Sequence, residues 1–261
     1  MTFVVPSATQ VFNSYLWDYL IVDLRSTSAY EKAHLDRAEP AAAGEWEKHE
    51  QQDLVIAYDE DGTVCVKPSD DNKKILERFR ERPKIRSIWL LEGGYDRFCK
   101  EFPFLCTDHP DCDPRLCYPQ KITDHIFLGS KICADEEKII QNLKLSHILN
   151  CTTECRDHFE DSSAFSLQYS RISVEDSLQE DLSAHFETAI DFLENVKRAN
   201  GRVLVHCSRG VSRSAAFVIA YLIKSEQMSA SEALKFIKER RSIVSPNQAF
   251  MLQLDQFASC Q

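Results

Sequence analysis

Apolar and polar positions along this chain form two recurring kinds of segment. Short apolar runs rich in β-branched residues, which are typical of buried strands, occupy residues 20–24, 54–58, 87–91, 124–129, 147–151, 169–174 and 203–205. Segments with apolar positions at helical spacing separate them, at residues 75–82, 133–143, 183–196, 214–224, 229–240 and 246–257. Strands that alternate with helices form parallel sheets covered by helices on both faces. The pattern therefore predicts an α/β fold.

A proline-rich stretch interrupts this alternation near the middle of the chain. Residues 107–120 contain Pro110, Pro114 and Pro119 and show no apolar periodicity, which is typical of an extended connection. A chain of 261 residues is long enough for two ordinary domains. We therefore expect one domain at residues 1–106, a linker at 107–120 and a second domain at 121–261.

Composition narrows the class of protein. A hydrophobic content of 43% with 28% charged residues is typical of a globular protein, and a formal charge of −10 argues against nucleic acid or an anionic membrane as the main partner. Residues 1–17 have neither a basic residue nor a sustained apolar core, so no secretory signal is expected. Ten cysteines without a regular framework predict free thiols and a location in the cytosol or nucleus.

Candidate chemistry is concentrated at the junction of the last predicted strand with the helix that follows it. The apolar run 203–205 leads into His206 and Cys207, and Arg213 follows six positions after the cysteine. A loop that runs from a strand into a helix N-terminus directs several backbone N–H groups at one point, where the helix dipole adds positive charge. Gly210 allows the turn to close tightly. Such a loop can bind a dianionic phosphate.

The same surroundings would make Cys207 reactive. Converging amides and the nearby Arg213 lower the pKa of a thiol, so that the nucleophilic thiolate is populated near neutral pH. Arg213 can then bind two phosphoryl oxygens bidentately. Ser212 and Ser214 carry hydroxyls that can solvate the thiolate or the loop backbone.

These residues carry a family resemblance. The order His206, Cys207, five residues, Arg213, Ser214 resembles the loop of cysteine-dependent protein phosphatases, in the variant usual among dual-specificity phosphatases. The resemblance implies a phosphocysteine intermediate and no metal or other cofactor. It also implies that the phosphate-binding residues are consecutive in the loop: Ser208, Arg209, Gly210, Val211, Ser212 and Arg213.

A general acid must come from another part of the chain, because an arginine cannot supply a proton at neutral pH. Asp176 follows the predicted strand at 169–174 and matches the general-acid position of the dual-specificity family. Glu175, Glu180 and Asp181 are nearby competitors, which we interpret as helix N-terminal charges. Asp176 is expected to act as acid in the first step and as base in the second.

The first domain resembles a rhodanese-like domain. The residues that carry the resemblance are Asp23, Arg25, Tyr30, His34, Gly93 and Gly94. In working rhodaneses the nucleophilic cysteine follows the strand that corresponds here to residues 54–58. This chain has Asp59, Glu60 and Asp61 at that place, and three carboxylates would repel an anionic substrate. We therefore expect a non-catalytic domain.

An inactive rhodanese-like domain followed by a dual-specificity catalytic domain resembles the MAP kinase phosphatases. That resemblance implies a phosphorylated protein substrate, with a MAP kinase as one candidate. Residues 37–53, where those phosphatases usually carry a kinase-docking arginine cluster, are acidic overall here. A basic run at residues 73–86 is either a solvated helix face or a docking patch for an acidic partner.

Two alternatives to a protein phosphatase remain open. A phosphoinositide or RNA-end phosphatase would share the loop but usually carries extra lysines in it, whereas this loop has only Arg209. The second alternative is a weakly active or non-catalytic adaptor that binds phosphoproteins, like the two-domain pseudophosphatase relatives. Those relatives have lost the loop cysteine, and this chain has kept Cys207.

Several further residues give weaker hypotheses. Asn247 is expected to hold the loop by hydrogen bonds, and Arg241 either meets a second substrate phosphate or is simply exposed. Cys151 either forms a protecting disulfide with Cys207 under oxidation or is a buried core thiol. A zinc site is a minor alternative, with four candidate ligands: Cys106, His109, Cys112 and Cys117.

Overall fold

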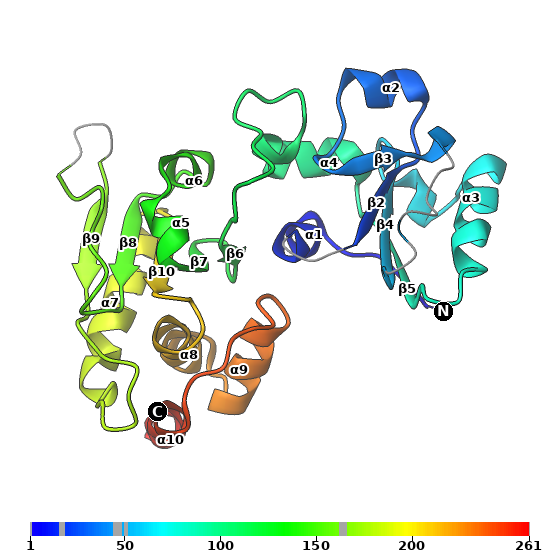
Figure 1. The fold of residues 1–261 in the computed structure, drawn as a ribbon. Coiled ribbons are helices and arrows are strands. Elements are labelled where there is room, and N and C mark those ends of the chain that lie inside the picture. Colours follow the sequence, from blue (N-terminus) through cyan, green and yellow to red (C-terminus); the bar gives the residue numbers. More distant parts are fainter. Residues whose placement is uncertain (1, 16–18, 44–48, 50–51, 162–165, 261) are drawn as a thin grey trace. The chain divides into compact units, whose positions relative to one another are not determined.

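The chain folds into two compact units. The computed structural model describes residues 2–15, 19–43, 49, 52–161 and 166–260, and it divides the chain between Leu116 and Cys117 (Figure 1). This division falls within the predicted linker at 107–120, whose extent stays a prediction. The backbone N–H of Thr107 donates to the carbonyl of His34 at 2.8 Å, and its side-chain oxygen accepts from the His34 N–H at 3.0 Å. These bonds tie the proline-rich segment to the first unit.

A parallel sheet of five strands forms the centre of the first unit. The strands are β1 (Thr2–Val4), β2 (Leu20–Asp23), β3 (Ala38–Pro40), β4 (Leu54–Tyr58) and β5 (Ser87–Leu90), in the spatial order β1-β5-β4-β2-β3. Every residue of β2 is buried, as expected for a parallel sheet covered on both faces. The strands predicted at 20–24, 54–58 and 87–91 are confirmed within one residue.

Helices cover both faces of this sheet, as Figure 1 shows. They are α1 (Ala8–Ser14), α2 (Thr27–Lys32), α3 (Asp70–Arg80) and α4 (Gly94–Glu101), with short 3-10 turns at Ala41–Ala43, Thr63–Cys65 and Pro103–Leu105. Leu76 and Phe79 of α3 join Leu20 and Val22 of β2 in one core cluster. Helix α3 begins five residues before the predicted start, because Ser69 accepts the Asn72 N–H at 3.1 Å and caps it.

The loop after β4 is closed by hydrogen bonds to one of its own side chains, that of Asp59. Both carboxylate oxygens of Asp59 accept backbone N–H groups, from Gly62 at 2.8 Å and from Val64 at 2.6 Å. The loop amides that an anionic ligand would need are thus already bonded to a carboxylate.

The second unit is built on a mixed sheet. Its strands are β6 (Gln120–Lys121), β7 (Ile126–Ser130), β8 (His147–Asn150), β9 (Gln168–Arg171) and β10 (Val203–Cys207), in the order β6-β7-β10-β8-β9. Only β6 runs antiparallel to its neighbour among the described strands of this sheet. The central position belongs to β10, which pairs with β7 on one side and β8 on the other. The carboxyl end of β10, at Cys207, therefore lies in the middle of the sheet edge.

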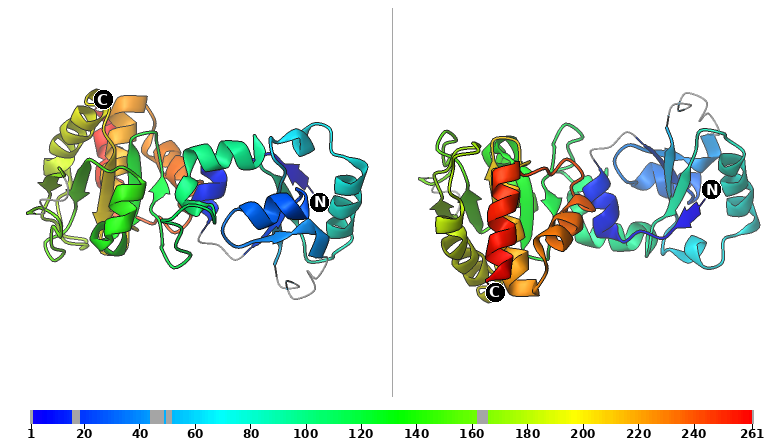
Figure 2. Two further views of the ribbon diagram at one scale, coloured as in Figure 1. Left: turned by 90° about the horizontal axis from the view of Figure 1, so that it is seen from above. Right: turned by 90° about the horizontal axis from the view of Figure 1, so that it is seen from below.

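Six helices are described in the second unit: α5 (Lys131–Asp135), α6 (Glu137–Asn142), α7 (Phe186–Arg198), α8 (Arg213–Glu226), α9 (Ala230–Lys238) and α10 (Gln248–Ser259). Figures 1 and 2 show α8 surrounded by α7, α9 and α10, and these helices pack directly on one another. All residues of α8 from Arg213 to Ile223 are buried. This explains why its sequence is apolar all round.

Three predicted helices differ in detail. The helix predicted at 133–143 is split in two, because Glu136 is extended and caps α6 through the Lys138 N–H. Ser183 does not cap α7 but lies in a 3-10 turn and donates to Asp181. The last helix is capped by Asn247 rather than opened directly by Pro246. In each case a local side-chain hydrogen bond decided the boundary.

The cysteines correct one expectation. Cys99 and Cys106 form a disulfide, so the prediction that all ten thiols are free is wrong for this pair. The free cysteines are those at 65, 112, 117, 133, 151, 155, 207 and 260. Because Cys106 is oxidised, the four-ligand zinc alternative fails, and the described part of the chain has no cluster of three or more potential metal-ligating groups. Within the same residues, no helix combines the length and apolarity needed to cross a bilayer.

The N-terminus of α9 provides a test of the fold. Ser229 and Glu232 form a reciprocal capping box there. We expect Ser229→Ala to lower the free energy of unfolding of the second unit by about 1 kcal/mol, because one helix amide loses its acceptor. Urea unfolding, monitored by far-ultraviolet circular dichroism, measures this change. The exposed Ser242, in the turn after α9, is the control, and Ser242→Ala should leave the midpoint unchanged.

Candidate active site

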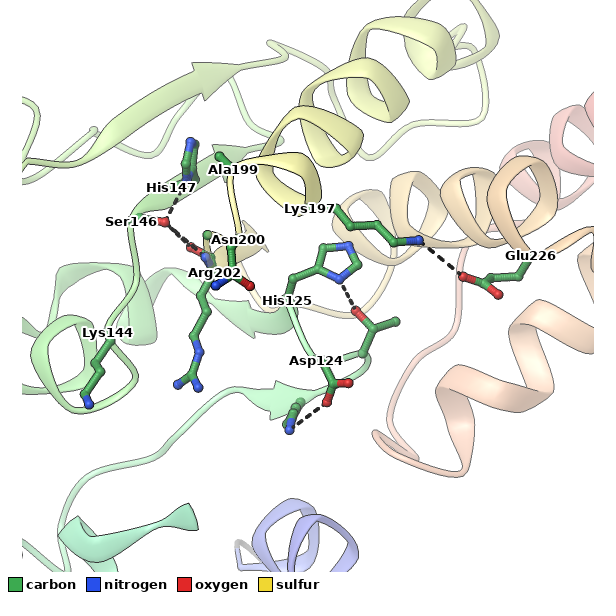
Figure 3. A pocket seen from close by; sticks show the side chains of 13 residues that line it. Asp124, His125, Lys144, Ser146, His147, Lys197, Ala199, Asn200, Arg202 and Glu226 are labelled. Atoms are coloured by element: carbon green, nitrogen blue, oxygen red, sulfur yellow. Dashed lines mark hydrogen bonds and ion pairs between the residues drawn. The ribbon is translucent and has the colours of Figure 1, made fainter. Parts of the chain in front are cut away.

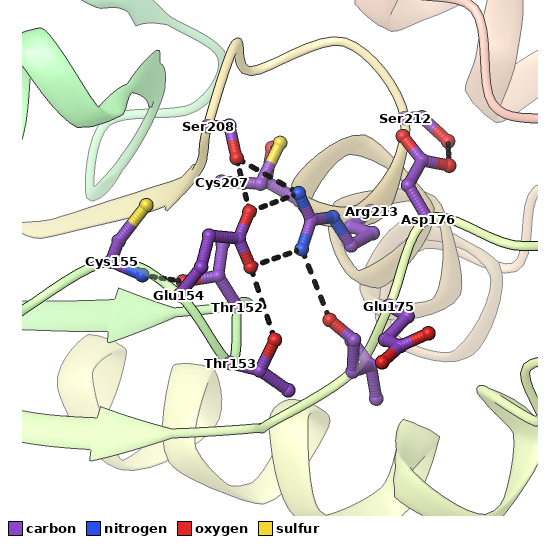
Figure 4. A network of polar contacts seen from close by, with 12 residues as sticks. Thr152, Thr153, Glu154, Cys155, Glu175, Asp176, Cys207, Ser208, Ser212 and Arg213 are labelled. Atoms are coloured by element: carbon purple, nitrogen blue, oxygen red, sulfur yellow. Dashed lines mark hydrogen bonds and ion pairs between the residues drawn. The ribbon is translucent and has the colours of Figure 1, made fainter.

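Strand β10 ends at Cys207, and the loop 208–212 leads directly into α8 (Figure 4). The three apolar residues of the strand are fully buried, so packing fixes the position from which the loop starts. Cys207 itself is only 3% exposed. Arg213 is the first residue of α8. The predicted junction of a strand, a loop and a helix N-terminus is confirmed.

The thiol of Cys207 is surrounded by hydrogen-bond donors. The Gly210 N–H and the Ser214 hydroxyl each lie 3.2 Å from Sγ. Burial raises the pKa of Cys207, but the hydroxyl of Ser214 and the backbone N–H groups of Ser214, Val211 and Gly210 outweigh it, so that the pKa lies below its usual value. The thiolate is therefore the form that this loop stabilises.

A buried arginine holds the outer side of the loop. Arg241 donates from Nε to the Gly210 carbonyl at 2.8 Å and from Nη2 to the Arg209 carbonyl at 3.0 Å, and from Nη1 to the side chain of Gln120. The hypothesis that Arg241 is exposed is therefore wrong, because its side chain is buried and binds the loop. A contact of Arg241 with a second substrate phosphate stays a prediction. By holding these carbonyls outside, Arg241 turns the N–H groups of the loop toward the thiol.

Gly210 is required in this loop. Its φ is +69°, in the left-handed region, and a Cβ there would collide with the carbonyl of Gly129 in the neighbouring strand β7. The close approach of the loop to β7 leaves no room for a side chain. Arg209, by contrast, is exposed and contributes to the described contacts through its backbone carbonyl.

Arg213 is held from several sides. Nη1 donates to the Val174 carbonyl at 3.1 Å, Nη2 donates to the Ser208 hydroxyl at 2.9 Å, and both also bind the Glu154 carboxylate. Burial lowers the pKa of Arg213, but the Glu154 carboxylate raises it by more, so the guanidinium remains charged. The buried Nε has no hydrogen-bond partner among the described residues. An unpaired buried donor costs about 1–3 kcal/mol, which an oxyanion bound beside it would recover.

Asp176 lies at the opposite side of the loop. Its Oδ1 accepts from the Ser212 hydroxyl at 2.7 Å and from Nδ2 of Asn247 at 3.1 Å. Asn247 also caps α10 by accepting the Phe250 N–H at 3.0 Å, so one side chain links a helix terminus to the carboxylate. Ser212 therefore serves Asp176 rather than the thiolate. The geometry brings Asp176, Ser212 and Asn247 together, with Asn247 reaching the loop through its N–H at 3.3 Å from the Ser212 hydroxyl.

The competing carboxylates are engaged elsewhere. Glu180 accepts the Glu175 N–H at 3.0 Å, and Asp181 accepts the Ser183 N–H at 3.0 Å. These are local contacts within the segment that precedes α7. The interpretation of these groups as helix N-terminal charges stays a prediction.

His206 and Cys151 flank the nucleophile without contacting a substrate site. Burial lowers the pKa of His206 to about 4, and neither ring nitrogen has a partner among the described residues, so the ring is neutral. Cys151 follows β8, which pairs with β10 in a register that places Asn150 opposite His206. Burial raises the pKa of the free Cys151 thiol. The protecting disulfide with Cys207 stays a prediction.

Glu154 is the main site residue that the sequence analysis missed. It lies in the loop after β8, and Arg213 holds the pKa of its carboxyl well below the usual range. The only sequence signal was its position, three residues after the predicted strand at 147–151, whose neighbour in the sheet carries Cys207. The carboxyl ends of adjacent parallel strands meet at one edge of the sheet.

A depression lies at the edge of the same sheet that is opposite the Cys207 loop, where β7, β8 and β10 begin (Figure 3). Its volume is about 840 Å³, and it is lined by polar side chains that include Lys144, His147 and Arg202. Lys197 pairs there with Glu226 at 3.9 Å. No cysteine lines the depression, and the Cys207 loop lies at the other edge of the sheet.

The origin of the thiolate can be tested by titration. We expect Ser214→Ala to raise the pKa of Cys207, because one donor to Sγ is lost, and the inflection in the rate of iodoacetamide alkylation against pH should move upward. Ser212→Ala is the matched control, because its hydroxyl donates to Asp176 instead of Sγ. An equal upward shift in both variants would show that the Ser214 bond is not the cause.

Comparisons with known proteins agree with this geometry. Residues 126–260 match the family model described as the dual specificity phosphatase catalytic domain. The human dual specificity protein phosphatase 4 is 34% identical over 232 residues, which cover 78% of this chain and 58% of that protein. The chain spans little more than half the length of the curated relatives it matches.

Solved structures resemble the same part of the chain. A human DUSP28 variant aligns with a TM-score of 0.52 and 29% identity, covering 56% of this chain and 97% of that one. The human tyrosine phosphatase-like serine/threonine/tyrosine-interacting protein aligns with a TM-score of 0.51 and 28% identity, covering 55% and 97%. Because the family model covers more than half of the chain, including Cys207, Arg213 and Asp176, this chain belongs to the dual specificity phosphatase family.

Proposed function

We propose that this chain is a protein phosphatase that hydrolyses phosphotyrosine and phosphoserine or phosphothreonine through a phosphocysteine intermediate. The observation that carries the proposal is the set of donors on the Cys207 sulfur, which keep a nucleophile ionised beside a guanidinium with an unpaired N–H. Membership of the family and the similarity to named dual specificity phosphatases support it.

In the first step, the Cys207 thiolate attacks phosphorus, an S–P bond forms and the P–O bond to the substrate breaks. Protonated Asp176 donates its proton to the departing oxygen. Both described hydrogen bonds of Asp176 go to Oδ1, which leaves Oδ2 for this proton transfer. The loop N–H groups and Arg213 stabilise the phosphoryl oxygens while charge develops on them.

In the second step, the Asp176 carboxylate takes a proton from water, the water oxygen bonds to phosphorus, and the S–P bond breaks to release phosphate and the thiolate. Charge neutralisation that metal ions provide in other phosphoryl-transfer enzymes is assigned here to the loop and Arg213. We therefore propose a reaction without a metal cofactor.

The first unit is proposed to be non-catalytic. Asp59 already occupies the amides of the loop that follows β4, through its bonds to Gly62 and Val64. A carboxylate in that position both repels an anionic substrate and removes the donors that would bind it. We also propose a location in the cytosol or nucleus, which the eight free cysteines support and the Cys99–Cys106 disulfide does not.

Substitution of the two reacting groups tests the proposal. Cys207→Ser should abolish release of phosphate from p-nitrophenyl phosphate and from phosphotyrosine and phosphothreonine peptides, because a serine hydroxyl is not ionised. Asp176→Asn should lower kcat by about 10²–10⁴-fold, because the departing oxygen loses its proton donor. Asp181→Asn is the matched control and should retain activity.

Other results would point to the alternatives. Turnover of phosphoinositides or triphosphate RNA with none of phosphopeptides would favour a lipid or RNA-end phosphatase. Phosphopeptide binding by the wild type with no more turnover than Cys207→Ser would favour the adaptor.

A phosphorylated MAP kinase is the proposed candidate substrate, with the basic run 73–86 as a docking patch. Within that run Lys73 and Lys74 pair with aspartates of the same helix, and the Arg80 guanidinium lies 5.4 Å from the Phe3 ring centre. Reversing Arg78, Arg80 and Arg82 to glutamate should weaken kinase binding by about tenfold or more while leaving p-nitrophenyl phosphate turnover unchanged. Unchanged kinase affinity in a binding assay would refute the role of residues 73–86 as a docking patch.

A further inference from the structure

Glu154 makes the most extensive contact with the catalytic arginine. Its Oε1 accepts from Nη2 of Arg213 at 2.7 Å and its Oε2 accepts from Nη1 at 3.0 Å, so the pair is bidentate (Figure 4). The Ser208 hydroxyl also donates to Oε1. The Arg213 side chain is 8% exposed and the Glu154 side chain 49%. The carboxylate thus approaches a buried guanidinium from the solvent side.

The loop that carries Glu154 is held in place by hydrogen bonds on both sides of that residue. Arg171 donates to the carbonyls of Thr152 at 3.0 Å and of Cys155 at 2.7 Å, on either side of Glu154. The Thr152 hydroxyl donates to Oδ1 of Asn150 at 2.7 Å and accepts the Cys155 N–H at 3.0 Å. Because the backbone is fixed on both sides, little conformational freedom is lost when the carboxylate meets Arg213.

Glu154 binds one edge of the Arg213 guanidinium and leaves a second edge available to a ligand. Glu154 occupies the edge formed by the two terminal nitrogens, and the remaining Nη1 hydrogen goes to the Val174 carbonyl. The edge formed by Nε and Nη2 has one buried N–H without a partner among the described residues and one that meets only the small hydroxyl of Ser208. A phosphate can therefore bind that edge bidentately while Glu154 stays bound.

We propose that Glu154 is a positioning residue for Arg213, which it orients so that the Nε edge faces the phosphoryl group. The proposal rests on the phosphatase activity proposed above and adds a residue to it. A guanidinium that must reorganise during the reaction stabilises the transition state less than one already in place. Glu154 acts through Arg213 and does not itself touch the substrate.

Glu154→Asp is the decisive variant, because it keeps the charge and shortens the side chain by one methylene. We expect kcat on p-nitrophenyl phosphate to fall about 10-fold in Glu154→Asp and about 10–100-fold in Glu154→Ala. Glu160→Ala, an exposed carboxylate of the same connection, is the matched control and should keep the wild-type kcat. An unchanged or higher kcat in Glu154→Asp would overturn the proposal.

A double-mutant cycle with Arg213→Lys shows whether Glu154 acts through the arginine. Lysine keeps the charge but lacks the planar fork. Glu154→Ala should then lower kcat less than about twofold in the Arg213→Lys background, since the interaction is already lost. Additive losses would mean that Glu154 only maintains the fold, and would overturn the proposal.

Binding of inorganic phosphate provides a readout that does not need turnover. In the Cys207→Ser background, titration calorimetry should give a phosphate Kd that is about 3–10-fold higher for Glu154→Asp, because Arg213 is less well oriented. Tighter binding would show that the carboxylate competes with phosphate, which contradicts a positioning role. An inactive wild type whose phosphate binding still weakens in this way would refute the phosphatase activity but not the role of Glu154.

Discussion

A buried negative charge on sulfur is the constraint on which the second unit depends. Cys207 is almost completely enclosed, and burial of an ionised group is costly unless donors replace the lost water. The chain supplies those donors from backbone amides and from the hydroxyl of Ser214 at the start of α8. The loop amides point toward the sulfur only if the loop carbonyls point away from it. A second layer of groups behind the loop therefore binds those carbonyls.

That second layer is made of residues far apart in the sequence. Arg241, which lies after α9, binds the loop carbonyls and is itself bound by Gln120 of the edge strand β6. The close approach of Gly210 to β7 completes the enclosure. The antiparallel strand β6 therefore has a second role besides covering the edge of β7, because its Gln120 is an acceptor that orients Arg241. The geometry around the sulfur is a property of the whole sheet edge rather than of the five-residue loop 208–212 alone.

Sequence reasoning identified the parts that are encoded locally. The strand, the loop and the helix around Cys207 follow from apolar periodicity and from a short spacing. Asp176 was chosen among its neighbours by the family resemblance, which its place after a strand only supports. Contacts made through space were not accessible in this way. The loop contacts of Arg241 were missed because a sequence does not show what surrounds a charged side chain, and Glu154 was missed because its partner lies 59 residues away. The helix at 133–143 was drawn too long, since one side-chain cap at Glu136 outweighed a continuous apolar pattern.

The burial of α8 has a consequence for how the second unit unfolds. Eleven successive residues of that helix, from Arg213 to Ile223, are sealed by its neighbours, so its first turn cannot fray independently of the core. The groups that bind phosphate therefore share the cooperativity of the whole second unit. On heating, the capacity to bind an oxyanion should disappear in the same transition as the core, without an earlier state that is folded but unable to recognise phosphate.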